Sequence, residues 1–262
     1  MNGAFVDAIG LIAPGLASWE SGVPILSGTA PYAPQPIGPI QPALLPANER
    51  RRAPLSVRIA LRAAEEATSA AGVEASALAS VFATSDADME IIHRICAALA
   101  EPERTVSPTD FHNSVHNAAS GYWSIGIGAR GPSTALSAYD FNLAAGLQEA
   151  LALLSIDDID VLLVLFDVPP PPPLYAARPV AQPAAVALLL CRQRSARTLA
   201  QLSICEATAE KTMADAGLEA LRRTNPAARA LPLLQLLAQK RSGIVGIRSY
   251  DDRFLGVRIE AP

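Results

Sequence analysis

The sequence is poor in the residues that build disulfide frameworks and metal centres. It has three cysteines, Cys96, Cys191 and Cys205, and three histidines among 262 residues. The cysteine number is odd, no two cysteines lie at short spacing, and each sits in an apolar run where a thiol behaves as a small hydrophobic group. We therefore expect neither a disulfide nor a zinc site, and nothing in the sequence predicts a cofactor.

Long basic tracts and long apolar runs are also missing. The net charge is -4, and without a basic tract the chain has no electrostatic footprint for nucleic acid. The longest apolar stretches, 161–173 and 183–191, are interrupted by Asp167 or by proline and fall short of the roughly 20 residues of a membrane helix. The N-terminus from Met1 to Asp7 lacks the basic segment of a secretory signal. These absences predict a cytoplasmic protein without a membrane or nucleic-acid partner.

The sequence is rich in apolar residues, and their spacing alternates along the chain between that of strands and that of helices. Hydrophobic residues make up 50% of the chain, enough for one large core, and we expect a single domain over residues 1–262. Strand-like segments at 5–11, 79–84, 133–139 and 160–168 alternate with helical patterns at 54–71, 86–100 and 141–154. This order predicts an α/β fold with a largely parallel sheet.

The segment after Asp167 has a different character. The run Pro169 to Pro173 should form a stiff irregular stretch, because proline enters neither a ladder nor a helix. Strands are expected at 184–192 and 199–209, close enough to pair with each other. A helix at 226–239 and a terminal hairpin of 243–250 with 254–260 complete the prediction. The triplet Arg50 to Arg52 is expected to be solvated, with contact to an acidic carrier protein as the alternative.

The most informative segment surrounds Asp140. Gly128-Ala129-Arg130-Gly131-Pro132-Ser133 leads through an expected strand into Asp140 and then into a helix. Together with Ser107 to Phe111, Asn113, Asn117, Gly121 and Gly126, this segment is similar in order and spacing to the block that precedes the reactive cysteine of β-ketoacyl synthases. The resemblance covers roughly the first 190 residues. It implies a three-layer α/β/α fold with a mixed sheet, equivalent to half of a thiolase fold, in which Asp140 occupies the cysteine position.

The departure from that family is as informative as the match. A reactive cysteine there is activated by the N-terminus of the following helix, whereas a carboxylate at this position is a weak nucleophile toward a thioester. The family also needs two histidines from a C-terminal half, but His93, His112 and His116 all precede Asp140. We therefore expect that this polypeptide does not catalyse condensation alone and that it lacks a second catalytic half.

Short proteins of this kind resemble the chain-length-factor subunits of polyketide and aryl polyene pathways. The resemblance implies a non-catalytic subunit that pairs with an active β-ketoacyl synthase, serves an acyl carrier protein through that complex, and shapes the acyl-chain tunnel. It implies a tunnel-lining role for Tyr122 or Trp123, although both are also ordinary core candidates. The implied dimer interface is the edge formed by Ser133, Thr134, Ala135, Leu136, Ser137, Ala138 and Tyr139.

Other interpretations remain open at this point. Asp140 is a good N-cap for a helix beginning at Phe141, which would make its role structural. A small acyl-thioester hydrolase or acyltransferase would use Asp140 with His112 or His116 as nucleophile or general base. His112 and His116 are spaced i, i+4, but the glutamate of the His-Glu-x-x-His zinc motif is absent between them, so no metal is expected. A self-associating scaffold is a third possibility.

Overall fold

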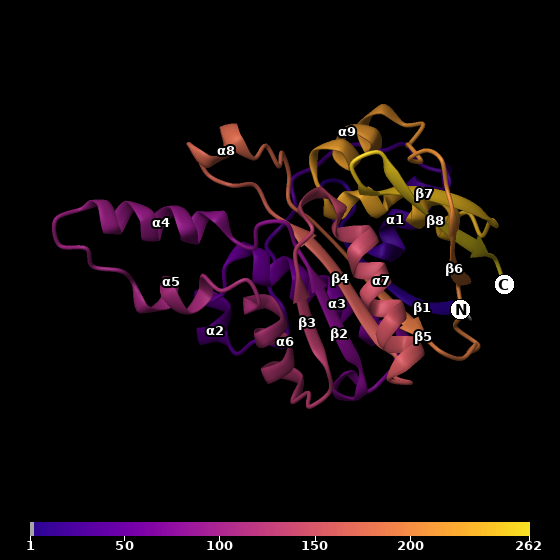
Figure 1. Ribbon diagram of the computed structural model, residues 1–262, viewed down its shortest axis with the longest axis horizontal. Helices are drawn as coiled ribbons and strands as arrows, with labels where there is room; N and C mark the ends of the chain where they lie inside the picture. Colours follow the sequence, from indigo (N-terminus) through magenta and orange to yellow (C-terminus); the bar gives the residue numbers. More distant parts are fainter. Residues whose placement is uncertain (1–2) are drawn as a thin grey trace.

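An eight-stranded mixed sheet runs through the computed structural model (Figure 1). The structure describes residues 3–262. Of the N-terminal segment that was expected to lack a secretory signal, Met1 and Asn2 lie outside the described residues. The strand order is β3-β2-β4-β5-β1-β6-β8-β7. The strands are β1 (Ala4–Ile12), β2 (Ala79–Ala83), β3 (Ser133–Leu136), β4 (Val161–Asp167), β5 (Ala184–Cys191), β6 (Ala200–Glu206), β7 (Gly243–Tyr250) and β8 (Arg253–Glu260). The strands expected at 5–11, 79–84, 133–139, 160–168 and 184–192 are all present in this sheet, as β1, β2, β3, β4 and β5.

Helices cover both faces of this sheet. They are α1 (Trp19–Ser27), α2 (Ala47–Arg52), α3 (Leu55–Ala71), α4 (Met89–Ala100), α5 (Pro108–Asn113), α6 (Ala118–Ile127), α7 (Asn142–Ile156), α8 (Leu174–Ala177), α9 (Ala216–Thr224) and α10 (Leu231–Ala238). Helices α3 and α6 contribute to the core on one face, and α1, α7, α9 and α10 contribute to the core on the other. The predicted three-layer α/β/α arrangement is confirmed.

Strand β4 shows how the sequence produces these layers. Its seven residues are all buried, and because successive side chains of a strand point to opposite faces, alternate residues enter different cores. Val161, Leu163 and Leu165 pack in the core with α7, and the residues between them pack in the core with α3. A continuous apolar strand of this kind is stable only between two layers, as the sequence predicted.

Two expectations about strand pairing are wrong. Among the strands of residues 3–262, the β2–β3 and β2–β4 pairs are parallel and the other pairs are antiparallel. β5 and β6 do not form a hairpin, because β1 lies between them and pairs with both. The physical reason is that β1 is a long, largely buried strand whose backbone groups need ladder partners on both sides.

The C-terminal segment covers the helix that follows Asp140. β7 contacts α7, and the rings of Phe141 and Tyr250 lie 6.2 Å apart. The predicted terminal hairpin is present as β7 and β8. The expected helix at 226–239 is divided into a 3₁₀ turn (Ala227–Ala230) and α10. Helices α1, α2, α5, α6, α8 and α9 were not predicted from the sequence.

One part of the chain projects from this body. Helices α4 and α5 form a long arm on the side of the molecule where β3 lies (Figure 1). Arg94 and Asp110 hold the two helices together through a two-point ion pair with distances of 3.1 and 2.7 Å. Apolar side chains remain exposed on the arm, among them Leu99 at 50% and Phe111 at 71%. No helix in the described part of the chain is long and apolar enough to cross a membrane.

Candidate functional site

Asp140 lies in a tight turn between β3 and α7. The strand ends at Leu136, and a 3₁₀ turn (Tyr139–Phe141) precedes the first residue of α7, Asn142. Tyr139 has φ +54°, in the left-handed region that a bulky residue rarely occupies. The predicted strand–turn–helix layout is confirmed, although the strand stops three residues before its predicted end at Tyr139.

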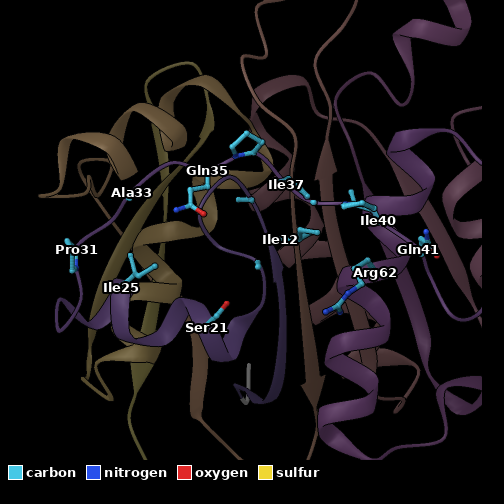
Figure 2. Close-up of a pocket in the computed structure, with 16 residues that line it drawn as sticks. Ile12, Ser21, Ile25, Pro31, Ala33, Gln35, Ile37, Ile40, Gln41 and Arg62 are labelled. Atoms are coloured by element: carbon cyan, nitrogen blue, oxygen red, sulfur yellow. The ribbon is translucent and has the colours of Figure 1, made fainter.

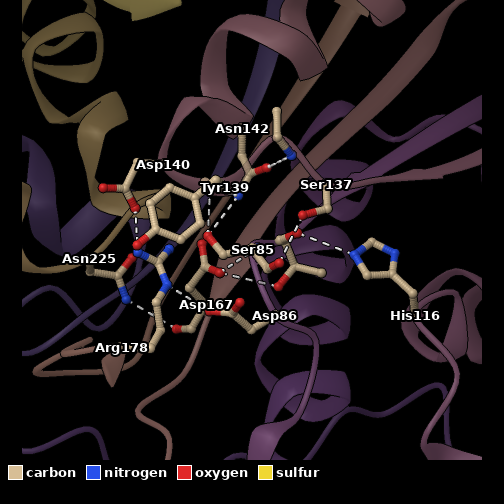
Figure 3. Close-up of polar contacts among 12 residues, drawn as sticks. Ser85, Asp86, His116, Ser137, Tyr139, Asp140, Asn142, Asp167, Arg178 and Asn225 are labelled. Carbon is tan, nitrogen blue, oxygen red and sulfur yellow. Dashed lines mark hydrogen bonds and ion pairs between the residues drawn. The ribbon is translucent and has the colours of Figure 1, made fainter. Parts of the chain in front are cut away.

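The N-cap role expected for Asp140 is wrong. The cap position of α7 is Phe141, and no side chain caps this helix. The Asp140 carboxylate is instead held by two arginines that lie far away in the sequence. Arg178 Nη1 is 2.7 Å from Asp140 Oδ1 (Figure 3). Arg229 Nη2 is 3.0 Å from Asp140 Oδ2. Each oxygen therefore has a cationic donor of its own.

Arg178 connects Asp140 to a second acid and to the strained turn. Its Nε donates to Asp86 Oδ2 at 2.8 Å, and its guanidinium lies 4.0 Å from the centroid of the Tyr139 ring. Burial opposes the charge on Arg178, but hydrogen bonds to Asp86 and Asp140 hold its pKa above the usual value. Ion pairs and ring contacts among Asp86, Tyr139, Asp140, Arg178 and Arg229 thus join the loop after β2, the turn between β3 and α7, the segment after the proline run and the 3₁₀ turn before α10.

Polar side chains, among them the buried Ser85 and Asn142, fix the backbone of the same turn. The Tyr139 carbonyl accepts hydrogen bonds from Ser85 Oγ at 2.7 Å and from Asn142 Nδ2 at 2.8 Å. Asn142 Oδ1 accepts the Ala138 N–H at 2.7 Å, and Ser137 Oγ donates to the Ser85 carbonyl at 2.8 Å (Figure 3). A left-handed tyrosine costs about 1–3 kcal/mol, so a network of this density is needed to hold it.

A second carboxyl group, Asp167, lies buried at the end of β4 beside this network. Its Oδ1 accepts the Ser85 N–H at 2.7 Å and the Thr84 hydroxyl at 3.2 Å, whereas Oδ2 is buried and has no hydrogen-bond partner among residues 3–262. Burial raises the pKa of Asp167 to about 7, against the lowering effect of these hydrogen bonds. The carboxyl group is therefore neutral or partly ionised at neutral pH.

The two candidate histidines do not join Asp140. His116 Nε2 lies 3.3 Å from the Thr84 carbonyl, and the His112 ring packs edge-on against Tyr122 at 6.1 Å. The polar contacts of Asp140 within residues 3–262 are those with Arg178 and Arg229. The same residues contain no group of three His, Cys, Asp or Glu side chains arranged to hold a metal ion.

The two aromatic candidates have different surroundings. Trp123 is 2% exposed and packs against Phe82 in the core beneath α6, with ring centroids 6.5 Å apart. Tyr122 is half-buried and lines a cleft of about 520 Å³ with His112, apolar side chains such as Leu44 and Val115, and the exposed Ile125. Trp123 therefore has the ordinary core role that its size favours, and only Tyr122 faces an open apolar space.

The predicted edge position of β3 is confirmed. β3 pairs only with β2 and ends the sheet. The carbonyls of Pro132 and Leu136 accept hydrogen bonds from β2, and because backbone groups alternate along a strand, the N–H and C=O of Ala135 point away from β2. Helix α6, which carries Tyr122, contacts β3. The outward N–H and C=O of Ala135 and the apolar cleft lined by Tyr122 thus lie at the same end of the molecule.

Sequence reasoning missed most of the residues that surround Asp140. Arg178 and Arg229 follow it by tens of residues and belong to no motif. Asp167 was noted only as an interruption of an apolar run, yet a carboxylate at the end of a fully buried strand is itself a signal of an unusual environment. Asn142, buried two residues after Asp140, was the nearest available indication.

Known proteins share sequence or fold with this chain. A family model described as beta-ketoacyl synthase, N-terminal domain, matches residues 27–247 and extends past residue 190, where the resemblance was expected to end. The ketosynthase ApeO in complex with its chain length factor ApeC from Xenorhabdus doucetiae aligns at a TM-score of 0.74 and 23% identity, over 98% of this chain and 99% of the other. The ishigamide ketosynthase/chain length factor gives 0.75 and 12%, over 99% of both chains.

A third solved structure, AntDE:AntF, is an acyl-carrier protein in complex with its ketosynthase. It aligns at a TM-score of 0.76 and 12% identity, over 100% of this chain and 99% of the other. A comparison with curated protein sequences finds no match. Likeness at these identities shows the fold, whereas the family model covers well over half of the sequence. The chain belongs to the β-ketoacyl synthase N-terminal domain family.

Proposed function

We propose that this chain is a non-catalytic chain-length-factor subunit that pairs with an active β-ketoacyl synthase and shapes its acyl-chain tunnel. The observation that carries the proposal is the state of the nucleophile position. Asp140 stands where the family has its reactive cysteine, and both of its oxygens are engaged by Arg178 and Arg229. The fold of the family is retained, whereas its nucleophilic cysteine is replaced by Asp140, whose charge is paired with two arginines.

A carboxylate in this position is a poor nucleophile for two reasons. Two guanidinium partners withdraw the electron density that an attack on a thioester carbonyl requires. The fixed ion pairs must also break before an oxygen could move toward a substrate. The alternative enzyme, a small acyl-thioester hydrolase or acyltransferase with His112 or His116, gains no support from the contacts, since neither histidine touches Asp140.

Two surfaces support the pairing. The outward N–H and C=O of Ala135 on edge strand β3 are suited to a strand from another subunit. The α4–α5 arm projects on the same side with exposed Leu99 and Phe111. The solved neighbours named above include ketosynthase and chain-length-factor complexes, and one of them holds an acyl-carrier protein. The proposed partners are therefore a ketosynthase subunit and, through it, an acyl carrier protein.

The proposed tunnel-shaping residue is Tyr122. It lines the 520 Å³ cleft beside α6, and α6 contacts the edge strand. A ketosynthase docked on β3 would cover this cleft, and the Tyr122 ring would then close the far end of an acyl tunnel. Trp123 supports that wall from the core without reaching the cleft.

The absence of acyl transfer to this chain can be measured directly. When the purified protein is incubated with acyl-coenzyme A or acyl-carrier-protein thioesters, intact-mass spectrometry should show no acylated species, because Asp140 is held by two arginines. The ketosynthase partner, treated in parallel, should acquire one acyl group on its cysteine. A stoichiometric acyl adduct mapped to Asp140 would contradict the proposal and favour the enzyme alternative.

The tunnel role predicts a change of product rather than a loss of activity. Tyr122→Ala, assayed with the co-expressed ketosynthase, should shift the products to longer chains at a similar total yield, because the cleft deepens by the volume of the ring. Tyr175→Ala removes an exposed tyrosine outside the cleft and should leave the product distribution unchanged. An unchanged distribution with Tyr122→Ala would contradict the tunnel role.

A further inference from the structure

A second cavity lies beside α3, apart from the cleft lined by Tyr122, and plays no part in the proposed pairing with a ketosynthase. It has a volume of about 780 Å³ and lies between α1, α3 and the segment 31–41, which we call the proline arch (Figure 2). It shares no residue with β3 or with the Tyr122 cleft. Its size falls in the range of about 300–1,000 Å³ that is usual for small-molecule sites.

The walls of this cavity are mainly apolar. Side chains from β1, α1 and the arch line it, including Ile12, Ile25, Ile37 and Ile40. The polar groups are few, and among the described residues that line the cavity Arg62 is the one with a charge. Figure 2 shows the Arg62 side chain extending from α3 into the space between α3 and α1. An apolar space with a single cation is suited to an apolar body that carries a single negative charge.

The cation is not satisfied by its neighbours. Its ion pair with Glu66 is long, at 3.7 Å. The two oxygens of Glu66 already accept the backbone N–H groups of Leu11 at 3.1 Å and Trp19 at 2.6 Å. Glu65, the adjacent acid, accepts the N–H of Leu44 at 2.6 Å. Both carboxylates are thus directed to the backbone, and the guanidinium retains donors for a ligand.

The arch is held over the cavity by specific contacts. The Gly15 N–H donates to the Gln35 carbonyl at 2.9 Å, and Tyr32 Oη donates to the Pro14 carbonyl at 2.9 Å. Gly15 has φ +72°, and a Cβ atom there would come within 2.3 Å of the Ala33 carbonyl oxygen. Four prolines stiffen the arch, Pro31, Pro34, Pro36 and Pro39. The roof is therefore preformed and depends on glycine at position 15.

We infer that this cavity is a binding site for an amphiphile with one carboxylate on a medium-length apolar chain. The carboxylate pairs with the planar guanidinium of Arg62 through two parallel hydrogen bonds, and the chain lies against the isoleucines beneath the arch. A head group with two charges is disfavoured, because the second charge would lie in an apolar space without a partner.

Isothermal titration calorimetry with decanoate, below the concentration at which it forms micelles, tests this inference on the full chain. Decanoate should bind saturably at one site, and decanol and acetate should each bind at least tenfold more weakly, a difference of about 1.4 kcal/mol. Arg62→Gln should weaken decanoate binding at least tenfold. Arg51→Gln, which removes an exposed arginine outside the cavity, should leave it unchanged. Saturable binding that is equal in Arg62→Gln, equal binding of decanol, or no saturable binding would each overturn the inference.

The arch supplies a second test that is independent of charge. Gly15→Ala should displace the roof and weaken decanoate binding severalfold, because its Cβ atom clashes with backbone. Gly121→Ala, on α6 and outside this cavity, has no atom within 4 Å of its added Cβ, so it should bind like the original chain. Equal affinities of these two variants would show that decanoate binds elsewhere.

Discussion

Ala135→Pro should abolish the proposed heterodimer with a ketosynthase while leaving the free chain folded. Proline removes the N–H of residue 135, which points away from β2, and therefore breaks no hydrogen bond within the sheet. A partner strand that adds to this edge loses one ladder hydrogen bond and meets the proline ring. The expected result is co-elution in the original complex and separate elution of the two chains in the variant, measured by size-exclusion chromatography.

The matched control keeps the backbone donor. Ala135→Ser makes a change of similar size at the same site but retains the N–H, so this variant should still co-elute with the ketosynthase. Condensation activity should follow the complex, being lost with proline and kept with serine. An Ala135→Pro chain that remains bound to the ketosynthase would contradict pairing through β3, and unimpaired condensation without this chain would contradict the subunit role as a whole.

The helices and strands that were predicted correctly from the sequence follow from local patterns. The helix from Leu55 to Ala71 and its stop at Gly72, the buried strand β4 and the terminal hairpin follow from periodicity and turn residues within a few positions of each other. The edge position of β3 came from the family resemblance. Pairings that join distant segments were not accessible in this way, and β1 between β5 and β6 is the clearest case.

At the candidate site, too, the sequence predicted what depends on neighbouring residues and missed what depends on distant ones. The turn at Asp140 was located from the Gly131-Pro132 segment, but its chemistry was misjudged, because a carboxylate before a helix resembles a cap whenever its long-range partners are unknown. Arg178 is placed by the segment after the proline run and Arg229 by the 3₁₀ turn before α10. No spacing rule connects either arginine to residue 140. Only the fold shows that the acid is neutralised rather than free to cap or attack.

Lowering the pH from 8 to 5 should increase the stability of this protein through Asp167. Its pKa is raised from 3.8 to about 7 by burial, with a further contribution from the negative charge of Asp86. Between these two values the folded chain holds a proton that the unfolded chain has released, so the free energy of unfolding falls as the pH rises. The contribution lost between pH 5 and pH 8 is on the order of 2–3 kcal/mol.

Asp167→Asn should remove this dependence. The amide has the shape of the protonated carboxyl group, its oxygen can still accept from Ser85 and Thr84, and it carries no charge to be neutralised. Urea unfolding at pH 5, 6, 7 and 8 should show a flatter profile for the variant, with its largest gain over the original chain at pH 8. Asp157→Asn, in the exposed loop before β4, should reproduce the original profile. Parallel profiles for Asp167→Asn and the original chain would mean that Asp167 is ionised in the folded protein throughout this range, and that its unpartnered oxygen is solvated.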